Sequence, residues 1–316
     1  MSETSSKTTK LIHGGIRYLE NLQFHEVKNG INDRKWWLEN FPDETKLQEI
    51  IILSKKKLSP EIFKFFFGIK VYETFAGRSN IKTGRLYKQD NLLSLGIKNN
   101  ISAGISFYDG LMQESVGQEI IKRCKSNGVN FYENNEIKSI RSEGRIEEKQ
   151  YKKIIIATGP WVSSFLKQNK IDTNKTIDYI KGSHLIINRK IKKGLMFRDQ
   201  KKHRYIFALP YQGNLLLGTT EQRVRSPEDN NVLDSEVNYL LESINIYIDR
   251  PINKDEIIKS YSGVRPLIKS KAQDFHSSSR DFYIQKDHNL LSLFGGKWTT
   301  APSIARNIVR IVNNEK

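Results

Sequence analysis

The residues with the clearest chemical potential stand close together near the start of the chain. Residues 5–10 supply hydroxyl and ammonium groups, and the string His13-Gly14-Gly15-Ile16-Arg17 follows them. A glycine pair lets backbone approach a bound ligand closely and reach positive φ. A histidine can move a proton near neutral pH, and an arginine offers a fixed fork to phosphate or carboxylate. The same residues also suit a polar loop that leads into an amphipathic helix, so this stretch alone leaves both interpretations open.

Together with strings further along the chain, this segment resembles the flavin-proximal part of FAD-dependent glycerol-3-phosphate dehydrogenases of the glycine oxidase/D-amino-acid oxidase superfamily. Each string is weak alone, but their common order across nearly the whole chain is specific. The strings are Ala157-Thr158-Gly159-Pro160-Trp161, Lys181-Gly182-Ser183-His184, Leu217-Gly218-Thr219-Thr220, Tyr261-Ser262-Gly263-Val264-Arg265-Pro266-Leu267, Ser279-Arg280-Asp281 and Phe294-Gly295-Gly296-Lys297-Trp298-Thr299-Thr300.

The resemblance implies an enzyme that oxidises sn-glycerol 3-phosphate to dihydroxyacetone phosphate. Hydride would pass to FAD, and a quinone is the implied electron acceptor. One alternative is another FAD-dependent amine or hydroxy-acid oxidoreductase of the same superfamily. A second alternative is a truncated remnant without catalytic activity.

The resemblance also implies roles for individual residues. His13 is the expected general base, Arg17 orients the substrate, and Tyr18 lines the same pocket. Arg265 matches the arginine that binds the substrate phosphate, and Lys297 matches a lysine close to flavin and substrate. The implied cofactor-binding residues are Ser5, Ser6, Lys10, Gly14, Gly15, Thr158, Gly159, Gly295, Gly296, Lys297 and Thr299. No metal site is expected.

Three further residues need separate interpretation. His184 follows Lys181-Gly182-Ser183, but no role is assigned to it. Gln113 and Glu114 replace a pair of aspartates that is usual in the family. We interpret Glu114 as a carboxylate that caps the dipole of the following helix.

Hydrophobic patterns predict an α/β fold with an α+β substrate part. Helices are expected at residues 16–40, 61–75 and 111–126. The second has a face of Ile62, Phe65, Phe66, Ile69 and Tyr72, which we expect to face the core, with a membrane or quinone contact as the alternative. A short strand at 105–108 should end in a turn at 109–110. A buried parallel strand is expected at 151–157, and short antiparallel strands at 176–220. Residues 79–104 look irregular.

These elements predict an incomplete FAD-binding, Rossmann-like domain interleaved with an antiparallel substrate domain. The FAD-binding parts would be residues 1–40, 105–175 and 258–316, the last of them also contacting substrate. Residues 41–104 would form a substrate or cap region, and residues 176–257 the antiparallel substrate domain.

The glycine-rich turn that normally holds the FAD pyrophosphate is missing from the sequence. No G-x-G-x-x-G string occurs anywhere in the chain. The family's C-terminal helical domain has no counterpart either. We therefore expect a chain truncated at both ends. A start codon further upstream, a decaying gene and a separate chain that supplies the missing unit all remain open.

Composition restricts the class of protein. The net charge is +17, hydrophobic residues make up 37%, and mean hydropathy is −0.56. No signal peptide or membrane span is evident, and Cys124 as the single cysteine excludes an internal disulfide. A cytoplasmic protein is expected, with peripheral association with the inner face of the cytoplasmic membrane as an alternative. The lysines are scattered, which favours biased composition over nucleic-acid binding, so no nucleic-acid partner is expected.

Overall fold

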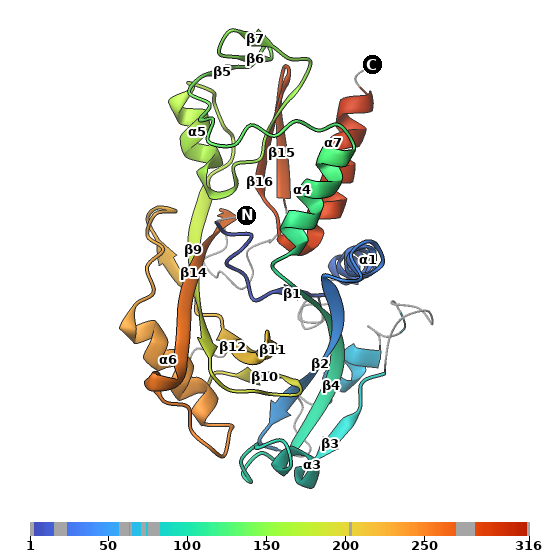
Figure 1. Ribbon diagram of the computed structural model, residues 1–316, viewed down its shortest axis with the longest axis vertical. Helices are drawn as coiled ribbons and strands as arrows, with labels where there is room; N and C mark the ends of the chain where they lie inside the picture. The colour runs from blue at the N-terminus through green and yellow to red at the C-terminus, as the bar shows by residue number, and fades with distance from the viewer. Residues whose placement is uncertain are drawn as a thin grey trace.

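The structure is a computed structural model that describes residues 3–15, 24–56, 63, 65–70, 74, 83–201, 204–269 and 282–314, with only the backbone for 24–26. The molecule is elongated, with a large curved sheet at one end and a small sheet at the other (Figure 1). Two long paired strands, β9 (Ile177–Ile187) and β14 (Ile257–Ile268), run between the two ends.

The large sheet is almost entirely antiparallel. Its order is β1-β4-β2-β10-β11-β12-β9-β13, with β14 also on β9 and β3 on β4, and among these described strands only β10 and β2 pair in parallel. The antiparallel strands predicted for residues 176–220 are confirmed. The remaining bounds in this sheet are β1 (Leu11–Ile12), β2 (Thr45–Ser54), β3 (Leu86–Lys88), β4 (Ala103–Met112), β10 (Gly194–Arg198), β11 (Tyr205–Tyr211), β12 (Asn214–Gly218) and β13 (Gln222–Val224).

Both faces of the large sheet are covered, which explains the continuous apolar run in β2. Ile51 and Leu53 face a cluster that includes α6 (Asp234–Asn245) and α3 (Gln89–Leu93). Ile50 and Ile52 face the opposite cluster, which includes Phe65 and Ile69. Alternate side chains of a strand point to opposite faces, so a strand with two covered faces must be apolar throughout.

The small sheet has the order β15-β16-β8. β8 (Ile154–Ile156) pairs in parallel with β16 (Leu290–Gly295), which confirms a parallel strand within residues 151–157. One face packs against α5 (Val162–Gln168), but Ile155 on the other face is 47% exposed. The other elements at this end are β15 (Phe282–Asp287), η2 (Gly159–Trp161), η4 (Trp298–Thr300) and α7 (Ala301–Asn314), together with a separate sheet of β5 (Ile140–Arg141), β6 (Arg145–Ile146) and β7 (Lys149–Gln150). At the opposite end, η3 (Lys254–Glu256) precedes β14 beside the large sheet.

The predicted turn at Asp109-Gly110 is wrong, because β4 continues through both residues to Met112. β4 lies between β1 and β2, and Gly110 pairs with Ile12 on one side and Leu47 on the other. A Cβ on Gly110 would lie 3.0 Å from Ile12 Cβ, so the glycine serves close strand packing. The following helix consequently starts late, as α4 (Val116–Ser126).

Other boundaries differ less. The first helix ends where predicted, as α1 (Phe24–Asn40), and residues 16–23 lie outside the described residues. Two short elements, β3 and α3, form within the segment that looked irregular.

The helical segment at Phe63 and residues 65–70 is apolar on two faces. Phe65 and Ile69 are buried as predicted, whereas Phe66 is 48% exposed, contrary to prediction. Phe63 and Phe67 are 57% and 71% exposed. Ile62 and Tyr72 lie outside the described residues.

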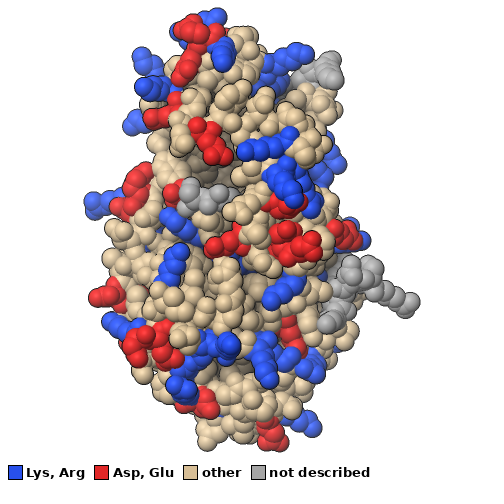
Figure 2. Space-filling view, viewed as in Figure 1, with Lys and Arg blue, Asp and Glu red and all other residues tan. Residues whose placement is uncertain are grey.

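Two kinds of feature are absent from the described part of the chain. None of its helices is long and apolar enough to cross a membrane, and none of its His, Cys, Asp and Glu residues form a metal-binding group. Basic and acidic side chains are interspersed over the face in Figure 2.

Trp37 joins the start of the chain to its end. It is 2% exposed and belongs to a cluster with Ile12, Phe41 and Met112, against which Trp298 packs. Its Nε1 donates a hydrogen bond to the carbonyl oxygen of Thr299 at 2.9 Å. The end of β1 is therefore held beside η4.

We predict that Trp37→Phe lowers the free energy of unfolding by about 1–3 kcal/mol, because the Thr299 carbonyl loses its buried donor. The neighbouring Trp36→Phe, at a half-buried ring, should cost less than about 1 kcal/mol. Urea unfolding followed by circular dichroism measures both. Equal losses in the two variants would contradict this role of Trp37.

Candidate functional site around His184 and the His13-Gly14-Gly15 turn

Residues 3–10 form a loop that lies on the paired strands β9 and β14. Thr4 Oγ1 donates to the Val264 carbonyl at 2.7 Å, and Tyr261 Oη donates to the Thr8 carbonyl at 2.8 Å. A Cβ on Gly263 would lie 2.9 Å from Lys7 Cβ, so only glycine lets the loop lie this close to β14.

Ser5 and Ser6, both predicted to contact the cofactor, lie in this loop. Ser5 is exposed, and Ser6 Oγ donates to the Glu3 carbonyl at 2.8 Å.

Lys10 ends the loop and is almost completely buried. It has φ of +60°, and its Nζ lies 2.9 Å from Glu114 Oε1 and 2.5 Å from the Ser6 carbonyl oxygen. The ammonium also lies 6.0 Å and 5.8 Å from the ring centroids of Tyr211 and Tyr261. Its role in cofactor binding stays a prediction, but these contacts fix its side chain inside the loop.

The interpretation of Glu114 as a helix cap is wrong. No side chain caps the start of α4, where Ser115 is the N-terminal cap residue. The hydrogen bond from Lys10 holds the pKa of the Glu114 carboxyl below its ordinary value. Glu114 thus ties the loop to the end of β4.

His184 is the functional candidate that sequence reasoning left without a role. Its ring stacks on Tyr261 with centroids 5.0 Å apart, and its Nε2 lies 2.9 Å from Thr9 Oγ1. Within the described residues its buried Nδ1 has no hydrogen-bond partner. Burial, and then the charges of Arg265, Lys10 and Arg204, lower the pKa of His184 well below its ordinary value. A neutral imidazole therefore stands among cations.

The alternation of strand β9 explains why His184 stands in the string Lys181-Gly182-Ser183-His184. Lys181 Nζ lies 2.8 Å from Glu236 Oε2, and Ser183 Oγ donates to Glu236 Oε1 at 2.9 Å, both on the face toward α6. Burial opposes ionisation of Glu236, but the hydrogen bonds, that of Lys181 first, keep its pKa below the ordinary value. Gly182 and His184 face the loop instead. The signal that could have identified His184 is its place in this family-like string, because β9 also contains Asp178, Lys181 and Ser183 and its polarity singles out no residue.

The Arg265 side chain lies across Gly182, on the face of the sheet that carries His184. Its Nη2 donates to Thr219 Oγ1 at 3.0 Å, and its Nη1 lies 3.8 Å from Glu221 Oε1. A Cβ on Gly182 would lie 2.4 Å from Arg265 Nη2. The Arg265 side chain is 27% exposed, and its contacts with Thr219 and Glu221 fix the direction of the guanidinium.

The His13-Gly14-Gly15 turn follows β1 and lies between β4 and α1. Gly14 and Gly15 are buried, His13 is half-buried, and Gly15 has φ of +84°. A Cβ on Gly30 of α1 would lie 3.0 Å from the Gly14 carbonyl carbon and oxygen. The predicted partners Arg17 and Tyr18 lie outside the described residues.

The second glycine turn, Gly295-Gly296-Lys297, is brought close to the first. Gly295 and Gly296 have φ of +70° and +86°, a region that favours glycine. η4 follows directly and packs against β1, and Thr299 is 4% exposed. Lys297 is half-buried.

Thr158 and Gly159 follow the carboxyl end of β8 in the small sheet, beside β16, the strand that ends at Gly295. Thr158 is exposed, and η2 packs against β14 and β16. The structure therefore groups Lys10, His184 and Arg265 in one place and joins the two glycine turns in another. Thr158-Gly159 lies beside β16, the strand that leads into the second glycine turn.

We predict that His184 makes stability depend on pH. Its folded pKa lies below the ordinary value of about 6.5, so below that pH the unfolded chain binds a proton that the folded chain refuses. The free energy of unfolding should then fall by up to about 1.4 kcal/mol per pH unit between about pH 6.5 and 5. In the His184→Gln variant the free energy of unfolding should fall less steeply over this pH range, by up to about 1.4 kcal/mol per pH unit. An unchanged slope in the variant, measured by urea unfolding, would contradict a buried neutral His184.

Comparison with known proteins shows which family the chain belongs to. Residues 1–311 match the family described as FAD dependent oxidoreductase. The chain is 28% identical to the glycerol-3-phosphate dehydrogenase of Pseudomonas tolaasii, over 97% of this chain and 63% of that protein. It is also 28% identical to the aerobic glycerol-3-phosphate dehydrogenase of Escherichia coli K12, over 96% of this chain and 65% of that protein. The chain thus spans less than two thirds of the length of these relatives.

Solved structures show the same fold. The glycerol-3-phosphate dehydrogenase from Bacillus halodurans complexed with FAD matches with a TM-score of 0.74 at 20% identity, over 99% of this chain and 57% of that one. The FAD-bound L-α-glycerophosphate oxidase from Mycoplasma pneumoniae matches with a TM-score of 0.76 at 18% identity, over 99% and 85%. The resemblance seen in the sequence is confirmed, and the chain belongs to the FAD-dependent oxidoreductase family.

Proposed function

We propose that this chain provides the substrate site and part of the flavin site of an FAD-dependent glycerol-3-phosphate dehydrogenase. The observation that carries the proposal is the partly exposed Arg265 side chain, whose guanidinium is held over Gly182 on the face that carries the buried His184. A dianionic phosphate gains from a directed fork of hydrogen bonds at a cationic site. The names of the relatives support the choice of substrate.

The residues around the two glycine turns fit a flat aromatic cofactor. Gly15, Gly295 and Gly296 all have positive φ, and a Cβ on Gly296 would lie 2.8 Å from Ile304 Cδ1. Backbone without side chains can approach a ring system closely. When bound, FAD supplies the acceptor for the hydride that leaves substrate C2.

The chain's own side chains have separate tasks in this proposal. Arg265 holds the phosphate, and Arg17 with Tyr18 orients the glycerol part. His13 takes the proton of the C2 hydroxyl, a role that suits a histidine near neutral pH. Lys297 adds positive charge near the ring system, and the N-terminal end of α7 favours negative charge at the same place.

The contacts with FAD come from two separate segments of the chain in this proposal. Ser5, Ser6 and Lys10 hold the cofactor from the loop. Thr158 and Gly159 hold it on the adenosine side, at the carboxyl end of β8, where open α/β sheets bind ligands.

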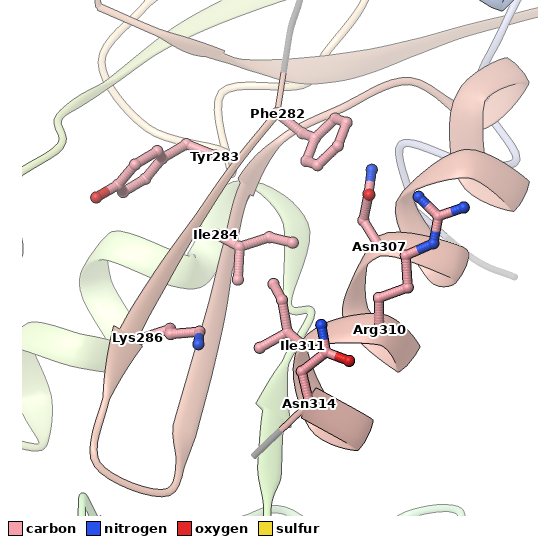
Figure 3. Close-up of a pocket in the computed structure, with 8 residues that line it drawn as sticks. All are labelled: Phe282, Tyr283, Ile284, Lys286, Asn307, Arg310, Ile311 and Asn314. Atoms are coloured by element: carbon pink, nitrogen blue, oxygen red, sulfur yellow. The ribbon is translucent and has the colours of Figure 1, made fainter.

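The small sheet offers a place for the missing pyrophosphate-binding unit. β8 pairs with β16 on one side, and no described strand pairs with its other side. On the face opposite α5, a groove of about 430 Å³ separates β15 from α7, with Ile284 and Ile311 turned toward one another (Figure 3). An added strand beside β8 and a helix over Ile155 would cover this apolar face, from a longer form of this polypeptide or from another chain.

We expect the purified chain with FAD to lose its visible flavin absorption when glycerol 3-phosphate is added without oxygen. Arg265→Met should raise the substrate concentration for half-maximal bleaching about 10–150-fold, because a charged hydrogen bond of about 1.5–3 kcal/mol is lost. Lys286→Met, at a cation in the distant groove, is the matched control and should change nothing.

Other outcomes identify the alternatives. Bleaching by amino acids or hydroxy acids, but not by glycerol 3-phosphate, would support another oxidoreductase of the superfamily. Absence of bound flavin, even with the strand–turn–helix unit of a relative added, would support a non-catalytic remnant.

Peripheral membrane association and a quinone acceptor complete the proposal. Phe63, Phe66, Phe67 and Lys70 recur at helical spacing on one exposed face, with Lys70 Nζ 5.9 Å from the Phe66 ring centroid. Aromatic side chains bordered by cations suit the interface of an anionic bilayer. Binding there would bring the enzyme within reach of a quinone dissolved in the membrane.

We predict that Phe66→Ser/Phe67→Ser weakens binding to phosphatidylglycerol vesicles by about tenfold or more, because two apolar rings no longer leave water. Phe131→Ser is the control, since Phe131 is also exposed and lies 5.7 Å from Lys125 Nζ. Vesicle sedimentation measures both. Equal binding by the wild type and the double variant would exclude this surface.

A further inference from the structure

The carboxylate of Asp109 lies directly against the backbone of the His13-Gly14-Gly15 turn. The Gly14 N–H donates a hydrogen bond to Asp109 Oδ1 at 2.8 Å. The same oxygen accepts from Arg34 Nη1 at 3.0 Å, and Nη1 also donates to the Tyr108 carbonyl at 2.8 Å. The side chains of Asp109 and Arg34 are only 2% and 4% exposed.

These contacts stand where the β1–β4 ladder stops. Ile12 pairs with Gly110, so continued pairing would bring Gly14 opposite Tyr108. Instead, Arg34 takes the Tyr108 carbonyl and the Asp109 side chain takes the Gly14 amide. The Asp109 side chain thus replaces the backbone acceptor that the Gly14 amide would have in a continued ladder. Pairing can therefore stop after Ile12 without leaving the Gly14 amide unsatisfied.

We propose that Asp109 and Arg34 are positioning residues for the His13 turn. Asp109 holds the turn through the Gly14 amide, and Arg34 compensates the buried charge of Asp109 and fixes the direction of its carboxylate. The consequence for catalysis rests on the proposed function, in which His13 takes the substrate proton. Neither residue is assigned contact with substrate or cofactor.

The close approach of α1 makes the turn sensitive to this hydrogen bond. Gly30 of α1 packs on the Gly14 carbonyl, and Arg34 reaches Asp109 from the next turn of the same helix. The turn is therefore enclosed by β4 and α1. Loss of the amide contact would allow Gly14, and His13 with it, to shift between them.

Two double variants of equal charge test the proposal. Arg34→Met/Asp109→Asn removes the ion pair but keeps an oxygen that can accept from Gly14. Arg34→Met/Asp109→Leu removes the acceptor as well. With glycine-selective ¹⁵N labelling, the Gly14 amide should exchange with solvent at least about tenfold faster in the Leu variant than in the Asn variant. The amide of Gly104, within β4, should be equally protected in both.

Equal exchange of the Gly14 amide in the two double variants would overturn the proposal. The wild type gives an independent test if a variant fails to fold. Its Gly14 amide should be protected at least about a hundredfold although it lies beyond the ladder, and fast exchange there would also overturn the proposal.

Turnover provides a second measurement, which would stay unchanged if Asp109 and Arg34 had a purely structural role. In the Leu variant kcat with glycerol 3-phosphate should fall while KM stays near that of the Asn variant, because phosphate binding at Arg265 is intact. Absence of turnover in the wild type would refute the proposed function alone, since the amide exchange does not depend on it.

Discussion

Residues 3–15 form almost no regular structure, so contacts with distant elements must hold them in place. Tyr261 of β14 binds the Thr8 carbonyl, Glu114 binds Lys10, and Asp109 accepts from the Gly14 amide. Each contact is buried or half-buried and polar, which makes it directional and costly to leave unmade. The chemistry at the start of the chain therefore requires the strands β4, β9 and β14 to be correctly paired.

This arrangement explains which features the sequence predicts well. The apolar run at Ile154–Ile156 forms the predicted parallel strand, and the glycines at 15, 295 and 296 adopt backbone conformations that favour glycine, so these positions follow from residue type. The Asp109-Gly110 pair is a local turn signal, but pairing with β1 and β2 overrides it. Contacts such as Lys10 with Glu114, 104 residues apart, leave no trace in local patterns.

Helical periodicity also predicts only part of the burial at Phe63 and residues 65–70. The spacing of three and four identifies an apolar face, and Phe65 and Ile69 are indeed buried. Phe63, Phe66 and Phe67 form a second apolar face at the same spacing, and periodicity cannot tell which face the protein covers. His184 shows the same dependence, because its neutral state arises from burial and from Arg265, Lys10 and Arg204, which the strands bring together.

A crystal structure of the chain with FAD and glycerol 3-phosphate is the most direct test of one substrate shared by Arg265 and His13. We expect the phosphate within hydrogen-bond distance of the Arg265 guanidinium and the C2 hydroxyl beside His13. A phosphate bound elsewhere, for example at Lys286 and Arg310 in the groove between β15 and α7, would contradict this site. So would a C2 hydroxyl that lies beyond the reach of the His13 ring.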